Sequence, residues 1–114
     1  MTIKTFNVER YQVSLNHELT ANLGATSIKA RGKVICYGEE HRLIAYFLVD
    51  DSPLPEPVYL VDKNIGAVFF HFKEMVSFID ILRHEKPVYA YLSDEKPEWS
   101  GIGTFRAPIG DRES

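Results

Sequence analysis

Cysteine is almost absent from this chain of 114 residues, since Cys36 is the only one. A single cysteine excludes an internal disulfide and a zinc site built from cysteine ligands. Long apolar runs are missing as well, because the longest run, residues 43–49, is far shorter than the roughly 20 residues that cross a bilayer. Nor does any stretch near residue 1 resemble a signal peptide. These absences predict a cytosolic protein without a membrane span.

No large excess of one charge is present, since 13 Lys and Arg stand against 16 Asp and Glu and give a net charge of −3. Residues 1–49 carry six basic and four acidic side chains, whereas residues 50–114 carry seven basic and twelve acidic ones. The acidic balance argues against binding of duplex DNA, which rewards clustered Lys and Arg. Hydrophobic residues at 45% predict a single globular domain over residues 1–107, followed by a flexible tail over residues 108–114.

Residues 72–85 form the clearest pattern, a helix that ends before Pro87. A polar stripe is expected at Lys73, Ser77 and Asp80. On a helical wheel six apolar side chains cover an arc of about 160°; they are Val76, Phe72, Ile79, Met75, Leu82 and Phe78. Ile81 extends this arc to about 220°. A surface helix usually needs an apolar stripe of about 100°. The pattern therefore predicts two covers for this helix, either a sheet that wraps around it or a sheet and a second subunit.

Strand patterns fill most of the remaining chain. Residues 3–15 alternate in two phases, which a bulge near Glu9 and Arg10 would reconcile, whereas residues 16–26 show no sustained period and predict a loop. Further strands are expected at about residues 27–37, 41–49, 57–61, 65–71, 87–92 and 98–105. Residues 50–57 place proline at every second position and predict an extended acidic loop.

This order of elements predicts an α+β fold, because one helix stands among six to seven strands. Short connections between consecutive strands favour antiparallel pairing. We therefore expect a strongly curved, mainly antiparallel sheet, or a partly open barrel, packed around the helix at residues 72–85.

Five apolar and aromatic residues are the predicted interaction surface: Phe78, Ile81, Tyr89, Tyr91 and Trp99. Phe78 and Ile81 belong to the oversized apolar arc of the helix, and the three aromatic residues belong to the last two predicted strands. Such aromatic residues pack against neighbouring strands or against another subunit. They would also stack on the bases of a single-stranded nucleic acid.

A row of cations alternates along the strand at residues 27–37, where Lys29, Arg31 and Lys33 are expected on one face. The opposite face is expected to be apolar, with Ile28, Ala30, Gly32, Val34 and Cys36. Three cations about 7 Å apart match an anionic ligand or the phosphates of a single strand. A solvated outer face with acidic neighbours such as Glu9 or Glu39 is the competing interpretation.

Catalytic and metal-binding patterns are not found. The four histidines form no HExxH or HxH arrangement, so neither a metal site nor a cofactor is expected. A pocket between helix and sheet that involves His71, Glu74 and Tyr89 is the one enzymatic or ligand-carrying alternative.

The function that the sequence favours is therefore a small non-enzymatic interaction domain that associates with itself as a dimer or larger oligomer. A module that binds single-stranded nucleic acid or an anionic ligand is the first alternative. The enzyme or ligand carrier is the second.

Overall fold

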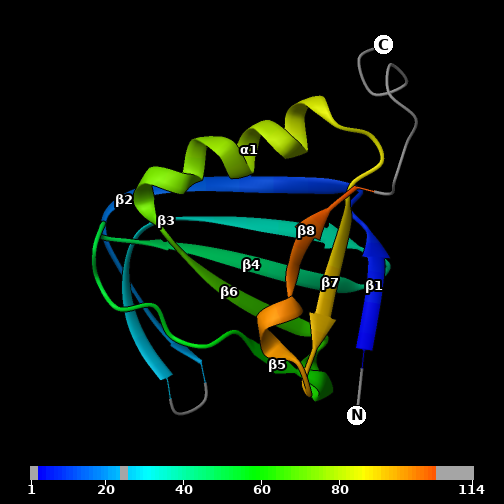
Figure 1. Ribbon diagram of the computed structural model, residues 1–114, viewed down its shortest axis with the longest axis horizontal. Coiled ribbons are helices and arrows are strands. Elements are labelled where there is room, and N and C mark those ends of the chain that lie inside the picture. Colours follow the sequence, from blue (N-terminus) through cyan, green and yellow to red (C-terminus); the bar gives the residue numbers. More distant parts are fainter. Residues whose placement is uncertain (1–2, 24–25, 105–114) are drawn as a thin grey trace.

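The computed structural model describes residues 3–23 and 26–104 (Figure 1). Its strands are β1 (Ile3–Asn7), β2 (Arg10–Leu23), β3 (Thr26–Gly38), β4 (His41–Leu48), β5 (Val58–Leu60), β6 (Ile65–His71), β7 (Tyr89–Ser93) and β8 (Gly101–Gly103). The helix α1 (Met75–His84) lies between β6 and β7, and the 3-10 turns are η1 (Val61–Lys63), η2 (Phe72–Glu74) and η3 (Pro97–Trp99). The predicted α+β class is confirmed. The tail predicted over residues 108–114 lies outside the described residues, and the single domain over residues 1–107 stays a prediction.

The described strands form two sheets, with the orders β1-β7-β8 and β2-β3-β4-β6-β5. All neighbours pair antiparallel except β4 and β6, which run parallel. Eight strands in two sheets therefore replace the single sheet of six to seven strands that the sequence predicts. The described strands close no barrel, so the prediction of a partly open barrel is not confirmed.

The chain changes from one sheet to the other at Val8 and Glu9. The Val8 N–H donates to the Val88 carbonyl oxygen beside the small sheet (2.9 Å), and the Glu9 N–H donates to the Tyr37 carbonyl oxygen of the large one (2.8 Å). The two phases of alternation in residues 3–15 therefore belong to two different strands, each of which alternates regularly in its own sheet. The single strand with a bulge near Glu9 and Arg10 was a wrong prediction.

The parallel pair β4–β6 arises from the proline-rich segment at residues 50–57. This segment is not a strand, and it carries the chain to the far edge of the sheet, where β5 pairs antiparallel with β6. Strand β6 then returns between β5 and β4 in the same direction as β4, with Arg42 beside Ile65. The predicted, mainly antiparallel pairing is therefore confirmed, and β4–β6 is the one parallel pair among the described strands, since the linker is long enough to reverse the direction.

The loop predicted over residues 16–26 is wrong, because β2 and β3 form one long hairpin there. Both strands are irregular at the same level: β2 shifts its register between Leu15 and Leu19, and β3 between Ala30 and Gly32. Bulges of this kind bend strands and increase their twist. Figure 1 shows β2 and β3 turning away from the direction of the other strands at this point.

Two hydrophobic clusters lie on the two faces of the large sheet. The larger one lies between the large sheet, the small sheet and α1, and its buried members are Phe6, Val34, Cys36, Leu43, Ala45, Phe47, Val68, Met75, Phe78, Ala90 and Leu92. The second cluster contains Ile28, Ala30, Tyr46, Leu48, Ala67 and Phe69. Strand β4 supplies alternate residues to both clusters, which confirms that it is apolar on both faces.

Helix formation begins with η2 at Phe72 and continues in α1 to His84, which agrees with the predicted helix at residues 72–85. The Lys73 N–H donates to Asp50 Oδ1 (2.8 Å), so an acidic residue from the proline-rich segment stabilises the start of the helix. The predicted polar stripe of Lys73, Ser77 and Asp80 is exposed, and this part of the prediction is confirmed. No helix among the described residues is long and apolar enough to cross a membrane.

Candidate interaction surfaces

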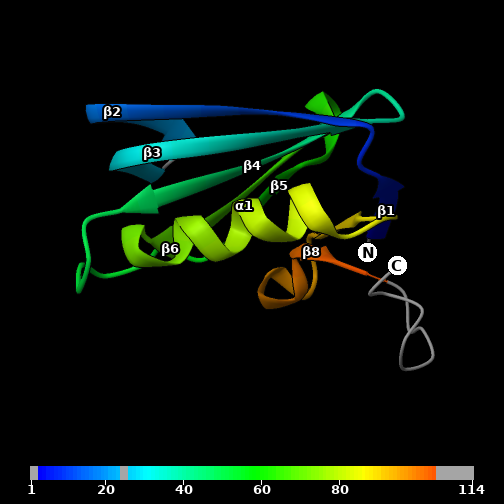
Figure 2. The same ribbon diagram turned by 90° about the horizontal axis from the view of Figure 1, so that it is seen from above.

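A groove of about 380 Å³ lies between α1 and the segment that contains η3 and β8. We call it the aromatic groove, and its lining residues are Phe70, Glu74, Ser77, Phe78, Ile81, Tyr91, Trp99, Ser100, Gly101 and Ile102. Four of the five predicted interaction residues therefore meet in one place. Figure 2 shows the segment of η3 and β8 next to the second half of α1, and residues of both line the groove.

The floor of the aromatic groove is rigid because its rings pack on one another. Phe78 contacts Phe47 edge to face at a centroid distance of 5.4 Å and Phe70 at 5.7 Å. The exposed fraction of Phe78 is only 6%, so this residue belongs to the core rather than to a subunit interface. Ile81 and Tyr91 are half-buried at the sides.

Trp99 forms the rim of the aromatic groove and is 63% exposed. It belongs to η3 rather than to the last strand, which corrects its predicted position. Hydrogen bonds hold this turn in place, since the Ser93 N–H donates to Ser100 Oγ (3.2 Å) and the Lys96 N–H donates to Ser93 Oγ (3.0 Å). Lys96 Nζ lies 5.4 Å from the centre of the Trp99 ring. Tyr89 is on the same side of β7 as Tyr91 but does not line the groove.

A second apolar surface lies on β2, which is an edge strand of the large sheet. Tyr11, Val13 and Leu15 are exposed to 37, 44 and 68%. They lie opposite Cys36, Val34 and Gly32 of β3, respectively, so they continue the apolar face of the sheet beyond its core. We call these three residues the β2 row. This surface was not predicted from the sequence, although the alternation of Tyr11, Val13 and Leu15 indicates it.

Helix α1 covers the same face of the large sheet to which the β2 row belongs, and Figure 2 shows β3 and β4 between β2 and α1. A Cβ atom added to Gly32 would lie 2.9 Å from the Met75 sulfur and 3.0 Å from the Ser14 carbonyl oxygen, so the Met75 side chain extends from the start of α1 over β3 toward the middle of β2. The part of the apolar arc that remains open contains Val76, which is 70% exposed. Of the two predicted interaction residues on the helix, Phe78 is instead buried, and Ile81 is half-buried beside the aromatic groove.

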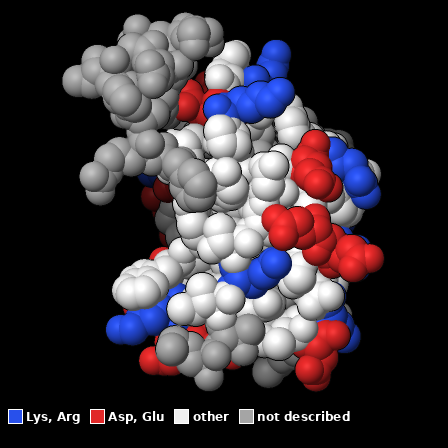
Figure 3. Space-filling view, turned by 90° about the vertical axis from the view of Figure 1, so that its right-hand side faces the viewer, with Lys and Arg blue, Asp and Glu red and all other residues white. Residues whose placement is uncertain are grey.

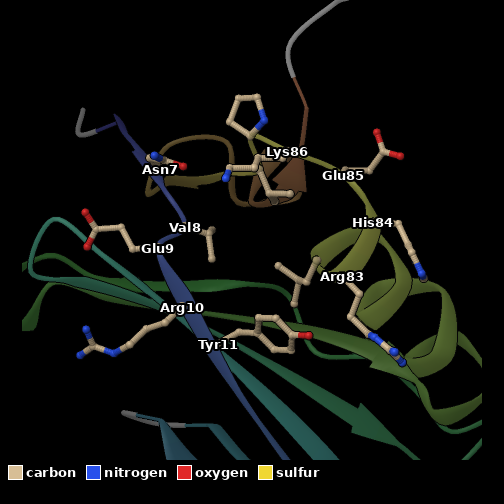
Figure 4. Close-up of a pocket in the computed structure, with 12 residues that line it drawn as sticks. Asn7, Val8, Glu9, Arg10, Tyr11, Arg83, His84, Glu85 and Lys86 are labelled. Carbon is tan, nitrogen blue, oxygen red and sulfur yellow. The ribbon is translucent and has the colours of Figure 1, made fainter. Parts of the chain in front are cut away.

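The end of α1 and the start of β2 enclose a wider groove of about 750 Å³. Figure 4 shows Tyr11 extending from β2 toward the end of α1, whereas Arg10 points to the opposite side. The charged residues that line this wider groove are of both signs: Glu9 and Glu85 are acidic, and Arg10, Arg83 and Lys86 are basic. This mixture identifies no single class of ligand.

The basic row does not lie on one face, because the bulge between Ala30 and Gly32 reverses the alternation of β3. The Arg31 guanidinium carbon lies 5.0 Å from the centre of the Phe72 ring on the side of α1. Lys33 is opposite Tyr46, which belongs to the second cluster. Lys29 pairs with Glu18 at 3.8 Å. The apolar face predicted for β3 is split in the same way, because Ile28 and Ala30 belong to the second cluster and Val34 and Cys36 to the first.

Figure 3 shows the side of the molecule opposite to the first half of β3, and charges of both signs are mixed there without a continuous basic stripe. The cations of β3 are themselves divided between the two faces of the large sheet. A phosphate chain binds best where cations follow one another along a single surface. The arrangement of Lys29, Arg31 and Lys33 therefore gives the nucleic-acid alternative less support than the sequence pattern did.

The residues of the enzymatic alternative do not meet in one pocket. Glu74 lines the aromatic groove, whereas His71 and Tyr89 do not. His71 Nε2 is instead hydrogen-bonded to the Ser52 carbonyl oxygen at 2.8 Å. Burial raises the pKa of the Cys36 thiol to about 12, so the thiolate that would act as a nucleophile is scarce at neutral pH. Within residues 3–23 and 26–104, no three His, Cys, Asp or Glu side chains are grouped closely enough to hold a metal ion.

Comparisons with models of protein families, with curated proteins and with solved structures found no significant match to this chain.

Proposed function

We propose that this protein is an interaction domain that associates with a second copy of itself through the open edge of β2. The observation that carries this proposal is the β2 row, in which Tyr11, Val13 and Leu15 are exposed side by side on an edge strand. An edge strand presents unpaired backbone N–H and C=O groups that a second strand can use. Most edge strands carry protective charges at such positions, whereas the β2 row is apolar.

The β2 row is complementary to itself. In an antiparallel pair centred on Val13, each Val13 lies opposite its equivalent, and Tyr11 lies opposite Leu15 of the second copy. All cross-strand pairs on this face are then apolar, and such pairs stabilise a sheet by about 0.2–1 kcal/mol each. This arrangement joins the two five-stranded sheets into one and requires no movement of the backbone.

Helix α1 would add to the same interface. Tyr11 lines the wider groove on the side of β2, and Leu82 and Arg83 line it on the side of α1. Val76 lies two turns before Arg83 on the same flank of α1. A second copy that pairs with β2 would therefore approach the exposed Val76 side chain. Covering apolar side chains in this way contributes about 25 cal/mol per Å² of apolar surface removed from water.

Sedimentation equilibrium of the purified protein tests the proposal. We expect a dimer at micromolar concentration for the wild type and a monomer for Val13→Lys, because a lysine at the centre of an edge strand opposes pairing. The matched control is Val61→Lys. Val61 is 39% exposed, similar to Val13, but it follows β5 at the opposite edge of the sheet.

The control variant should remain as dimeric as the wild type, and circular dichroism should show the same fold for all three proteins. A monomeric wild type at high micromolar concentration contradicts the proposal. A dimer that Val13→Lys leaves intact contradicts the assignment to β2.

A further inference from the structure

The aromatic groove has the chemistry of a binding site that is separate from the β2 row. Most of its lining side chains are aromatic or aliphatic, two are serines (Ser77 and Ser100), and the one charged side chain that lines it is Glu74. Within the described part of the chain, no cation forms an ion pair with Glu74. An exposed tryptophan beside an apolar groove is typical of residues that dominate binding energies.

The surroundings of the aromatic groove are acidic as well. The segment of residues 94–98 contains Asp94, Glu95 and Glu98 against the single cation Lys96. Lys96 itself shows that a cation can sit on the Trp99 ring, since its Nζ lies 5.4 Å from the ring centre. Complementary charges steer and select partners at interfaces, so the groove favours a basic partner over an anionic one.

The backbone at one wall of the groove is open. Among the described strands, β8 is the edge of the small sheet, and a Cβ atom added to Gly101 would meet no atom of the described residues within 4 Å. A glycine at an edge allows the backbone of another chain to approach closely. Extended peptides bind to such edges as an additional strand, with side chains in neighbouring pockets.

From these observations we infer that the aromatic groove binds an extended peptide of another protein, with an arginine or lysine flanked by apolar residues. The aliphatic part of the basic side chain packs on Trp99 and Tyr91, and its charged end pairs with Glu74. The peptide backbone lies along β8 at Gly101. A volume of about 380 Å³ is at the small end of the range for ligand pockets, which suits one or two side chains rather than a large cofactor.

Trp99 provides the measurement, because it is the only tryptophan of the chain and its fluorescence reports on the groove directly. The probes are three acetylated and amidated heptapeptides of alternating leucine and threonine that differ only at the central position, which is arginine, citrulline or glutamate. Citrulline has nearly the shape of arginine without its charge. We expect a saturable change with the arginine peptide, binding about fivefold weaker with the citrulline peptide, and no saturable change with the glutamate peptide.

Two variants assign the contacts. Glu74→Gln should weaken binding of the arginine peptide to the level of the citrulline peptide and leave binding of the citrulline peptide unchanged, whereas the control Glu56→Gln, at an exposed site in the proline-rich segment, should change neither. Gly101→Val should weaken binding of both peptides at least about tenfold, because its side chain occupies the space that the peptide backbone needs. Circular dichroism should show that each variant keeps the wild-type fold.

Equal affinity for the arginine and glutamate peptides, or an arginine preference that persists in Glu74→Gln, would overturn the inference. So would the absence of any saturable change at millimolar arginine peptide. The same titration with Val13→Lys separates this site from self-association, since we expect its peptide affinity to equal that of the wild type.

Discussion

The Arg31 guanidinium carbon lies 5.0 Å from the centre of the Phe72 ring, on the face of the large sheet that α1 covers. Arg31 reaches that face because β3 bulges between Ala30 and Gly32. Its charge is therefore used within the molecule, by stacking on an aromatic ring. Lys29 and Lys33 lie on either side of the bulge, so the three cations present no common surface.

We expect no salt-sensitive binding of single-stranded DNA tighter than about 100 μM near physiological salt, which is the weak end of non-specific binding. The measurement is fluorescence anisotropy of a labelled oligonucleotide at several salt concentrations. Replacement of Lys29, Arg31 and Lys33 by Gln together should leave the signal unchanged. Micromolar binding whose salt dependence falls in the triple variant would restore the anionic-ligand alternative.

Gly66 on β6 packs tightly against the small sheet, because a Cβ atom added there would clash with Cδ2 of Leu92 on β7. We expect Gly66→Ala to lower the free energy of unfolding by about 1–3 kcal/mol, the usual cost of overpacking. Urea denaturation measures the change. Gly101→Ala is the control, since its added Cβ would meet no atom within 4 Å.

A double variant makes this test specific. If the clash with Leu92 is the cause, Leu92→Val together with Gly66→Ala should cost less than the sum of the two single changes. Strict additivity would show that the two side chains do not contact each other.

Glu39 joins the turn between β3 and β4 to the small sheet. The Asn7 N–H donates to Glu39 Oε2 (3.0 Å) and Lys4 Nζ lies 3.4 Å from Oε1. These hydrogen bonds lower the pKa of the Glu39 carboxyl below its ordinary value of 4.5. A carboxyl whose pKa is lower in the folded protein stabilises it above the unfolded pKa and loses this contribution as the pH falls through the folded pKa.

We therefore expect Glu39→Gln to be less stable than the wild type at pH 7, by an amount that shrinks as the pH falls below 4.5. Urea denaturation at a series of pH values measures the difference. Glu40→Gln is the matched control, because Glu40 is the neighbouring turn residue with a similarly positive φ angle. An equal pH dependence in both variants would contradict the role of the Asn7 and Lys4 contacts.

The rotation of α1 about its own axis is tested by comparing alanine variants of two apolar residues that lie two positions apart. Phe78 is 6% exposed and packs on Phe47 and Phe70, so Phe78→Ala should cost about 3–5 kcal/mol of unfolding free energy. Val76 is 70% exposed, so Val76→Ala should change it by less than about 0.5 kcal/mol. Similar losses in the two variants would show that the helix is turned differently.

The elements that the sequence predicts correctly are those in which one periodicity continues without interruption. The helix at residues 72–85 and the alternation of residues 88–92 are of this kind, and both occur in the structure. Residues 16–26 have no regular alternation because the bulges in β2 and β3 interrupt it, and the hairpin depends on the pairing of residues 19–23 with residues 26–30 rather than on a repeating pattern. Local patterns do not contain that information.

The candidate surfaces were predictable only in part. Four of the predicted interaction residues do meet in the aromatic groove. Phe78 and Ile81 lie on the flank of α1 that faces Tyr91 of the following strand across this groove. The open flank of the helix was not predictable, since its exposure depends on the position of the small sheet. That sheet includes β1, whose place beside β7 no local pattern reveals.

Disulfide trapping at Val13 tests the central proposal most directly. In the antiparallel pair centred on Val13, the two equivalent Cα atoms lie about 4.5–5.5 Å apart, within the range that a disulfide spans. Cys36, the only native cysteine, does not compete because it is buried and its pKa is about 12. Under mild oxidation Val13→Cys should therefore form a covalent dimer, whereas the more exposed control Leu15→Cys should not, because Leu15 lies opposite Tyr11 of the second copy. A covalent dimer of Leu15→Cys alone, or equal yields from both variants, would contradict pairing of two copies through β2.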